Sequence, residues 1–183
     1  VNPSSILLLT FTNRAAREML RRVEVLTKGQ SKRVWGGTFH HVGNRILRRY
    51  AQQVGYTENF SILDTDDRSA LVRAALSDTV GKQAKMSFPT ASVIGNAISL
   101  AIDTQTNLSS VILERYPYFA HVTDEIVGVA KEFSRRKRSM DAMDFDDLLL
   151  FTHRLLQDHE DVRVALRTQF QHILVDDFQD TNR

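Results

Sequence analysis

The most suggestive chemistry lies at the end of an apolar run, where one carboxylate follows directly on another. Residues 173–175 are Ile-Leu-Val, and Asp176 and Asp177 come immediately after them. An apolar run of this kind predicts a short buried β-strand. Adjacent acids at the C-terminal end of such a strand are typical of sites that hold Mg²⁺ beside a nucleoside triphosphate. The sequence therefore predicts a magnesium and nucleotide site at this point.

Polar residues also follow the apolar runs 6–10 and 34–38, which predict buried strands. The segments at these ends are Thr10-Phe11-Thr12-Asn13 and Gly37-Thr38-Phe39-His40. Open parallel sheets bind ligands at the carboxyl ends of their strands. Hydroxyls and helix N-termini can hold phosphates there, and aromatic rings can stack on bases. In the alternative interpretation, Phe11 and Phe39 are ordinary core rings, and His40 only packs at the start of a helix.

The elements that must position these residues alternate between strand and helix patterns. Apolar runs predict strands over 6–10, 34–38 and 60–63, and helical spacing of apolar residues predicts helices between them. Asn13 is the expected N-cap of the first helix. The resulting β-α-β-α-β order predicts a parallel sheet with flanking helices.

The pattern changes after this point, because residues 64–140 give only helical signals. They predict an all-helical insertion in an α/β domain. Beyond it, Asp144 is the expected N-cap of a helix, with Asp146 and Asp147 in the favourable first turn. The buried stripe expected for that helix consists of Leu148, Leu149, Leu155 and Leu156. A short helix and a last strand over 172–175 follow.

Composition sets looser limits on function. The 183 residues carry a formal net charge of only +2, so the overall charge does not require a nucleic-acid partner. The basic residues cluster, however, and each cluster is either a solvated face or a binding surface. The sequence has no cysteine, which excludes disulfides and thiolate metal sites and fits a cytoplasmic protein. No signal peptide or membrane-spanning run is found. The three basic clusters named above consist of Arg14, Arg17, Arg21 and Arg22; of Arg45, Arg48 and Arg49; and of residues 135–138.

Taken in order, the motifs resemble those of the UvrD/Rep/PcrA-like superfamily 1 DNA helicases. Residues 10–19 resemble motif Ia, 37–40 motif Ib, 143–149 the segment that re-enters the motor domain, and 175–182 motif II, the Walker B strand. The resemblance covers essentially the whole chain. It implies an α/β fold, a partial RecA-like parallel sheet with flanking helices, interrupted by an all-helical 1B-like insertion. The implied parts are 1–63 and 141–183 in the motor domain and 64–140 in the insertion.

The resemblance implies an ATP-dependent 3′→5′ helicase or translocase. Its partners would be single-stranded DNA, duplex junctions and a second RecA-like domain, and its cofactors ATP and Mg²⁺. By position, the single-strand track would comprise Phe11, Thr12, Asn13, Thr38, Phe39 and His40. Asp176 would bind Mg²⁺, Asp177 would orient or deprotonate the attacking water, and Gln179 would sense the nucleotide. Arginines of the insertion would meet duplex DNA.

Departures from the family pattern concern the nucleotide site. The family's second acid is glutamate, whereas Asp177 is one methylene shorter, a loss of roughly 1.5 Å of reach. Asp177 is therefore either the catalytic base or a carboxylate that only stabilises the metal site. The chain also contains no Gly-x-x-x-x-Gly-Lys-[Ser/Thr] loop, since Gly81-Lys82 is followed by Gln83. We expect the chain alone to bind ATP and Mg²⁺ weakly and not to hydrolyse ATP.

Other interpretations remain open. One is a non-enzymatic module that binds single-stranded nucleic acid and has lost the motor; another is a helical protein-interaction module. The motifs fit equally well a parent protein that acts in DNA repair, in replication restart or in plasmid maintenance, so they do not select one of these pathways. Salt dependence separates the interpretations, because contacts to phosphates make affinity fall steeply with salt.

Overall fold

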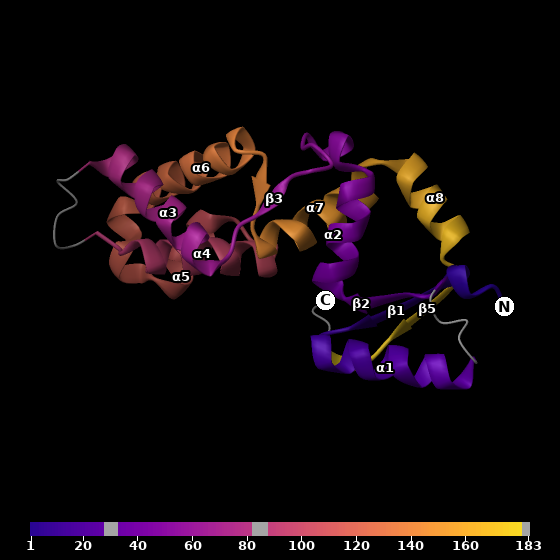
Figure 1. Ribbon diagram of the computed structural model, residues 1–183. Helices are drawn as coiled ribbons and strands as arrows, with labels where there is room; N and C mark the ends of the chain where they lie inside the picture. Colours follow the sequence, from indigo (N-terminus) through magenta and orange to yellow (C-terminus); the bar gives the residue numbers. More distant parts are fainter. Residues whose placement is uncertain (28–32, 82–87, 181–183) are drawn as a thin grey trace. The chain divides into compact units, whose positions relative to one another are not determined.

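The computed structural model describes residues 1–27, 33–81 and 88–180, which form two compact units (Figure 1). The first unit consists of Val1–Glu58 and Leu148–Arg183, and the second of Asn59–Asp147. The predicted insertion, 64–140, lies inside the second unit. Its identification with the family's 1B subdomain stays a prediction.

A parallel sheet of three strands forms the centre of the first unit. The strands are β1 (Ile6–Thr10), β2 (Trp35–Thr38) and β5 (His172–Val175), in the order β2-β1-β5. Leu8 of β1 lies in register with Gly36 on one side and Leu174 on the other. A 3₁₀ turn, η1 (Pro3–Ser5), precedes β1. The predicted α/β fold, a partial parallel sheet with flanking helices, is confirmed.

Helices cover both faces of this sheet, with α1 (Asn13–Leu26) on one side and α2 (Phe39–Arg49) on the other (Figure 1). The side chain of Leu20 on α1 comes so close to β2 that a Cβ added to Gly36 would lie 2.6 Å from it. Thr12, not Asn13, caps α1, because its hydroxyl accepts a hydrogen bond from the amide of Ala15. The predicted cap was therefore wrong by one residue.

The expectations for two other strands were also wrong. The strand expected at 60–63 is only β3 (Ser61–Ile62), and it pairs with β4 (Ala142–Met143) in a separate small sheet of the second unit. Strand β5 was expected to be buried, yet Ile173 is 60% exposed and Leu174 is 49% exposed. Strand β5 lies at the edge of the sheet, and among the described residues α1 and α2 pack on β1 and β2 instead.

Four helices build most of the second unit: α3 (Thr65–Val80), α4 (Ala91–Asp103), α5 (Leu108–Arg115) and α6 (Thr123–Ser139). A 3₁₀ segment, η4 (Pro117–Val122), joins α5 to α6. Asp64 begins α3 by accepting hydrogen bonds from the amides of Asp66 and Asp67. The core contains Phe133 and Val129 of α6, both fully buried. This unit therefore has its own hydrophobic core.

Helix α7 (Phe145–Asp158) starts in the second unit and ends in the first, where α8 (Glu160–Gln169) follows it. Leu148 and Leu155 of its expected stripe are buried, but Leu149 is 38% exposed, because it points away from the face that the other two share. The remaining 3₁₀ turns are η3 (Ala51–Val54) and η5 (Phe178–Asp180). Within the described residues, no helix has the length and apolarity needed to cross a membrane.

A buried cluster of charges joins α6 to the start of α7 within the second unit. The ammonium of Lys137 donates hydrogen bonds to the carboxylates of Asp144, at 2.9 Å, and Asp147. All three residues are at most 4% exposed. The basic block 135–138 was expected to face solvent or DNA, and for Lys137 that expectation was wrong. The apolar stem of Lys137 follows the buried face of α6, and its charge is matched by the acids.

Burial and the neighbouring charges shift the pKa values of Asp144 and Asp147. Burial raises the pKa of Asp147 to about 6, and the nearby Asp144 carboxylate adds to the rise while Lys137 opposes it. Burial also disfavours ionised Asp144, but Lys137, the Asp147 amide and Arg68 outweigh it and hold the pKa of Asp144 below its usual range. Arg68 further bonds Asp146 at 3.1 Å. The cluster therefore holds two cations against three carboxylates, and of Asp144 and Asp147 it is Asp147 that takes up a proton at the higher pH.

Candidate nucleic-acid and nucleotide site

The parallel sheet brings three polar segments to one edge of the first unit. Strands β2, β1 and β5 all run in the same direction, so their C-terminal ends lie together. The amide of Asp176 donates a hydrogen bond of 2.9 Å to the carbonyl of Leu9, which ties the end of β5 to the end of β1. Neighbouring strands are about 4.8 Å apart, so the ends of β2 and β5 are separated by about 10 Å. We call this edge the rim.

An aromatic pair lies on the β1–β2 side of the rim. The ring centroids of Phe11 and Phe39 are 5.2 Å apart, and the planes are tilted by 50°. Phe11 is 41% exposed and Phe39 is half-buried. Sequence alone left both rings open to assignment as core residues, but an exposed Phe11 is not one. Exposed aromatic faces at a strand end can stack on nucleic-acid bases.

The threonines of the rim hold the loops that present this pair. The hydroxyl of Thr38 accepts a hydrogen bond of 3.2 Å from the amide of His41, which caps α2. The hydroxyl of Thr12 caps α1, and the buried Thr10 donates a hydrogen bond of 2.9 Å to the carbonyl of Thr12. Thr10 was not assigned a role from sequence, although a hydroxyl at the end of an apolar run was the available signal.

The remaining expected DNA contacts differ in accessibility. Asn13 is exposed in the first turn of α1, and its backbone carbonyl accepts a hydrogen bond from Arg17. His40 is half-buried in the first turn of α2, and Thr38 is only 9% exposed. The structure thus places all six predicted track residues at the ends of β1 and β2. Asn13 and Phe11 are more open to solvent than Thr38.

The acids lie on the β5 side of the rim. Asp176 is half-buried at the end of β5, whereas Asp177 and Gln179 are exposed. Asp177 has a left-handed backbone, with φ of 52°, which aspartate tolerates better than most residues. The next residues of the predicted motif, 181 and 182, lie outside the described part of the chain.

The donor set at this end fits Mg²⁺ only in part. Proteins bind Mg²⁺ through one or two carboxylates together with substrate phosphates, and Asp176 provides such a carboxylate on the rim. Within the described residues, no group of three or more His, Asp or Glu side chains could hold a metal ion by itself. The oxygen chemistry therefore suits Mg²⁺ that arrives with a nucleotide.

Comparison with known proteins identifies the family to which this chain belongs. The UvrD/REP helicase N-terminal domain family matches residues 1–183, the whole chain. The chain belongs to that family. The resemblance of the motifs to superfamily 1 helicases is thereby confirmed.

Individual relatives agree with this membership. The chain is 33% identical over 187 residues to the ATP-dependent DNA helicase PcrA of Staphylococcus aureus, which covers 100% of the chain and 24% of that protein. It is 36% identical over 190 residues to the ATP-dependent DNA helicase UvrD1 of Mycobacterium tuberculosis, again over 100% of the chain and 23% of the relative. The UvrD/REP domain described here thus spans about a quarter of the length of these relatives.

Proposed function

We propose that this chain is the part of an ATP-dependent DNA helicase motor that carries the single-strand track and one side of the nucleotide site. The observation that supports it most strongly is the shared rim, where the Phe11–Phe39 pair and Asp176 follow neighbouring parallel strands. A motor that moves on DNA must couple the two kinds of site, and one rigid sheet provides a short connection. The family and the names of the relatives support the same proposal.

On the track side, stacking is the main proposed interaction. A base that stacks on Phe11, supported from behind by Phe39, would gain about 1–3 kcal/mol. The exposed amide of Asn13 would bond the strand, and His40 would contact its backbone or bases. Thr12 and Thr38 would act chiefly through the helix caps, because their hydroxyls already accept amide hydrogen bonds.

On the nucleotide side, Asp176 would hold Mg²⁺ together with the phosphates of ATP. The ion, when bound, neutralises charge on the triphosphate. Asp177 would orient the attacking water or accept its proton, and Gln179 would sense the nucleotide. Because the 183 residues contain no Gly-x-x-x-x-Gly-Lys loop, we propose that this chain by itself does not turn over ATP. Phosphate release above a protein-free blank, abolished by Asp176→Ala, would contradict that proposal.

The same absence supports a second candidate, a single-strand binding module without motor activity. It shares the track with the leading proposal, but its rim acids would have no part in binding nucleotide. Titration of the chain with ATP and Mg²⁺, monitored by calorimetry, separates the two. Weak binding of ATP and Mg²⁺ that Asp176→Ala abolishes would support the motor. A heat of titration that is the same with and without this substitution would support the binding module.

Further proposals rest on family membership alone. They are a 3′→5′ direction, contact of the helical unit with duplex junctions, a second RecA-like domain as partner in the parent protein, and a cytoplasmic location with a role in DNA repair. The motor proposal depends on none of them.

The track is tested by titrating a fluorescent single-stranded oligonucleotide with the chain at several salt concentrations. Phe11→Ala and Phe39→Ala should each weaken binding about tenfold, as expected for one lost stacking contact. Tyr118→Ala is the matched control, because Tyr118 is an aromatic residue of the second unit that is 72% exposed. An equal loss of affinity in all three variants, or no loss in Phe11→Ala and Phe39→Ala, would contradict the proposal that these rings form the single-strand track.

A further inference from the structure

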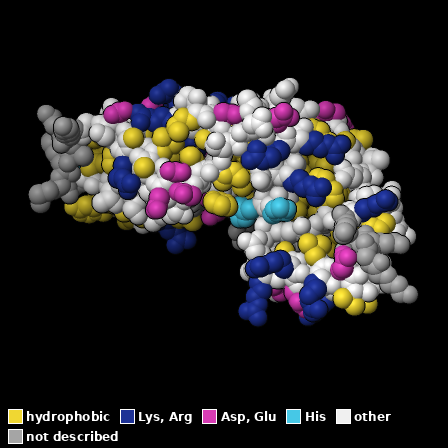
Figure 2. All heavy atoms as spheres, in the orientation of Figure 1, with side chains coloured by type: hydrophobic (Ala, Val, Ile, Leu, Met, Phe, Trp, Pro, Cys, Tyr) yellow, Lys and Arg dark blue, Asp and Glu magenta, His cyan; other side chains and the backbone are white. Residues whose placement is uncertain are grey.

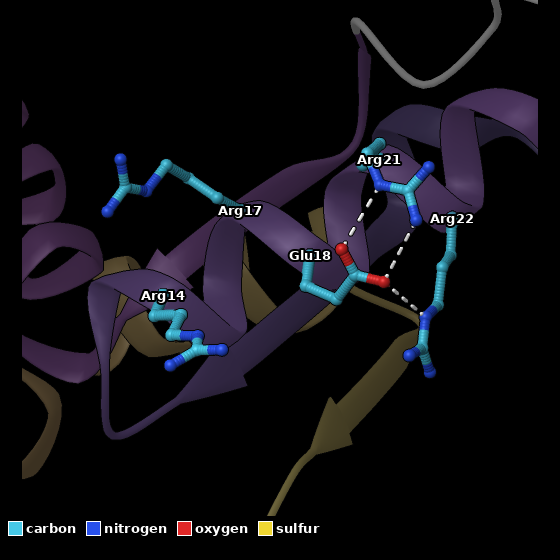
Figure 3. Close-up of a pocket in the computed structure, with 5 residues that line it drawn as sticks. All are labelled: Arg14, Arg17, Glu18, Arg21 and Arg22. Carbon is cyan, nitrogen blue, oxygen red and sulfur yellow. Dashed lines mark hydrogen bonds and ion pairs between the residues drawn. The ribbon is translucent and has the colours of Figure 1, made fainter.

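The outward face of α1 carries a stripe of arginines that the proposed track does not use. Figure 2 shows dark blue side chains gathered over the part of the first unit that α1 forms in Figure 1. Figure 3 shows the five side chains that project from this helix and line one hollow. They are Arg14, Arg17, Glu18, Arg21 and Arg22. We call this set the α1 stripe.

The positive charge of the α1 stripe is only partly neutralised. Glu18 accepts hydrogen bonds of 3.0 and 3.1 Å from Arg21 and one of 2.9 Å from Arg22. These bonds lower the pKa of Glu18 to about 2, so it stays ionised near neutral pH. Arg17 donates to the carbonyl of Asn13, and no ion pair forms at Arg14 or Arg17 among the described residues. Four guanidinium groups thus share one carboxylate, which leaves three positive charges in excess.

Packing does not explain these arginines. The buried Ala16 and the contact of Leu20 with Gly36 show that the other side of α1 faces the sheet. All four arginines are exposed, and their side chains point into solvent. A helix that needed only solubility would gain as much from alternating charges as from an excess of one sign.

The geometry of the stripe matches a chain of phosphates. Arg14, Arg17 and Arg21 are three or four positions apart, as are Arg14, Glu18 and Arg22, so the stripe lies along one face of the helix. From Arg14 to Arg22 the row is about 12 Å long, since each helical residue rises 1.5 Å. Each nucleotide of a single strand carries one phosphate, so a row of this length faces only the few phosphates that follow the stacked bases. Guanidinium groups bind phosphate oxygens through paired hydrogen bonds.

The stripe is also continuous with the rim. Arg14 comes two residues after Thr12 and three after Phe11, in the first turn of α1. We infer that the DNA strand, after it leaves the aromatic pair, continues along α1 with its phosphates on the α1 stripe. This inference rests on the proposed function and extends the binding site beyond the strand ends. The partner is the DNA backbone, since the row of like charges begins where the bases would stack.

The test compares oligonucleotides of two lengths with the full chain, by fluorescence anisotropy at several salt concentrations. One has about four nucleotides, to cover the rim and little more, and the other about twelve, to extend over the stripe as well. Arg14→Gln with Arg17→Gln should lower the salt slope for the long strand by about 1.4, that is about 0.7 for each phosphate contact. At 0.1 M salt this corresponds to binding about 25-fold weaker, for equal affinities at 1 M salt. Affinity for the short strand should fall much less, because only the start of the stripe lies beside the rim.

Matched variants separate this result from a general loss of charge. Arg154→Gln with Arg167→Gln removes the same charge from exposed arginines of α7 and α8 in the same unit and should have little effect. Glu18→Gln frees Arg21 and Arg22 from their shared carboxylate and should strengthen long-strand binding and steepen its salt slope. Circular dichroism confirms that each variant is folded.

Several results would overturn the inference. It fails if Phe11→Ala weakens binding while the double stripe variant changes neither slope nor affinity, and the proposed function then survives. It also fails if Glu18→Gln weakens binding, or if poly-glutamate competes as well as an oligonucleotide of equal charge, which would make the stripe a general anion surface. If the unmodified chain binds neither oligonucleotide, the proposed function and the inference fail together.

Discussion

Replacing Lys137 by methionine removes one cation from the buried charge cluster of the second unit. Methionine has a similar length and an apolar stem, so the core is not left with a large cavity. Asp144 keeps the guanidinium of Arg68 at 3.2 Å, but Asp147 loses the ammonium that it contacts. Asp147 is only 4% exposed, so water cannot replace the lost charge. The variant must bury an unpaired carboxylate or protonate it.

The cost follows from that choice. Removing one partner of a buried ion pair costs about 3–5 kcal/mol. Protonation of Asp147 accounts for only part of this cost, because the carboxyl of the unmodified protein, with a pKa of about 6, gains about 1.4 kcal/mol from ionising at pH 7; the lost contacts of Lys137 account for the rest. We therefore expect Lys137→Met to lower the free energy of unfolding at pH 7 by about 4 kcal/mol.

The loss should shrink in mild acid. In the unmodified protein the pKa of Asp147 is raised to about 6, so the stability linked to this group is greatest below 3.8 and is lost as the pH rises through 6. In the variant we expect this pKa to exceed about 7. Between pH 7 and 6, Asp147 is then protonated in the folded variant but largely ionised in the folded unmodified protein. The difference between the two proteins should therefore be smaller by about 1.4 kcal/mol at pH 5. The lowered pKa of Asp144 acts in the opposite sense, but only as the pH falls below 3.8.

The assay is urea unfolding monitored by circular dichroism at pH 7 and pH 5. Trp35, the one tryptophan of the sequence, lies in the first unit, so its fluorescence reports separately on that unit. Lys131→Met is the matched control, because Lys131 is an exposed lysine of the same helix, and its loss should change stability by less than about 0.5 kcal/mol. A loss below about 1 kcal/mol for Lys137→Met, or one that grows between pH 7 and pH 5, would refute the reasoning.

Other substitutions test the packing of each unit by urea unfolding. Phe133→Ala should cost about 3–5 kcal/mol, because the ring is fully buried in the core of the second unit; a loss under 2 kcal/mol would mean that the site collapses readily. Thr12→Ala should cost about 1 kcal/mol as the cap of α1, whereas Asn13→Ala should cost clearly less, and the reverse order would restore Asn13 as the cap. Gly43→Ala should cost about 1–3 kcal/mol, because the new Cβ would lie 2.9 Å from the Thr152 hydroxyl, and a neutral result would show that α2 and α7 can separate freely.

Local patterns in the sequence predicted the elements well, and their pairing less well. The apolar runs at 6–10, 34–38 and 172–175 became β1, β2 and β5, because consecutive apolar residues favour a strand, although β5 is largely exposed. The run at 60–63 carries the same signal, yet it pairs with Ala142–Met143, about 80 residues away. Pairing depends on hydrogen bonds such as that from Ser61 to Asp141, and no local pattern encodes such a partner.

In the same way, the sequence predicted which segments of the candidate site would meet, but not the buried charge cluster of the second unit. The strand-end rule predicted that the segments around Phe11, Phe39 and Asp176 would share an edge, and the parallel sheet confirms this arrangement. The burial of Lys137 could not be read from a run of four basic residues. It depends on the acids of α7 reaching the same face of α6, which is a property of the tertiary fold.

The measurement that tests the central proposal most directly is hydrogen–deuterium exchange of the full chain with and without a single-stranded oligonucleotide. We predict slower exchange in the segments 10–15 and 37–41, at the ends of β1 and β2, with no change in the core of α3 and α6. Phe11→Ala should remove that protection at the same oligonucleotide concentration. Protection confined to the helical unit, or none at saturating oligonucleotide, would show that the rim is not the DNA track.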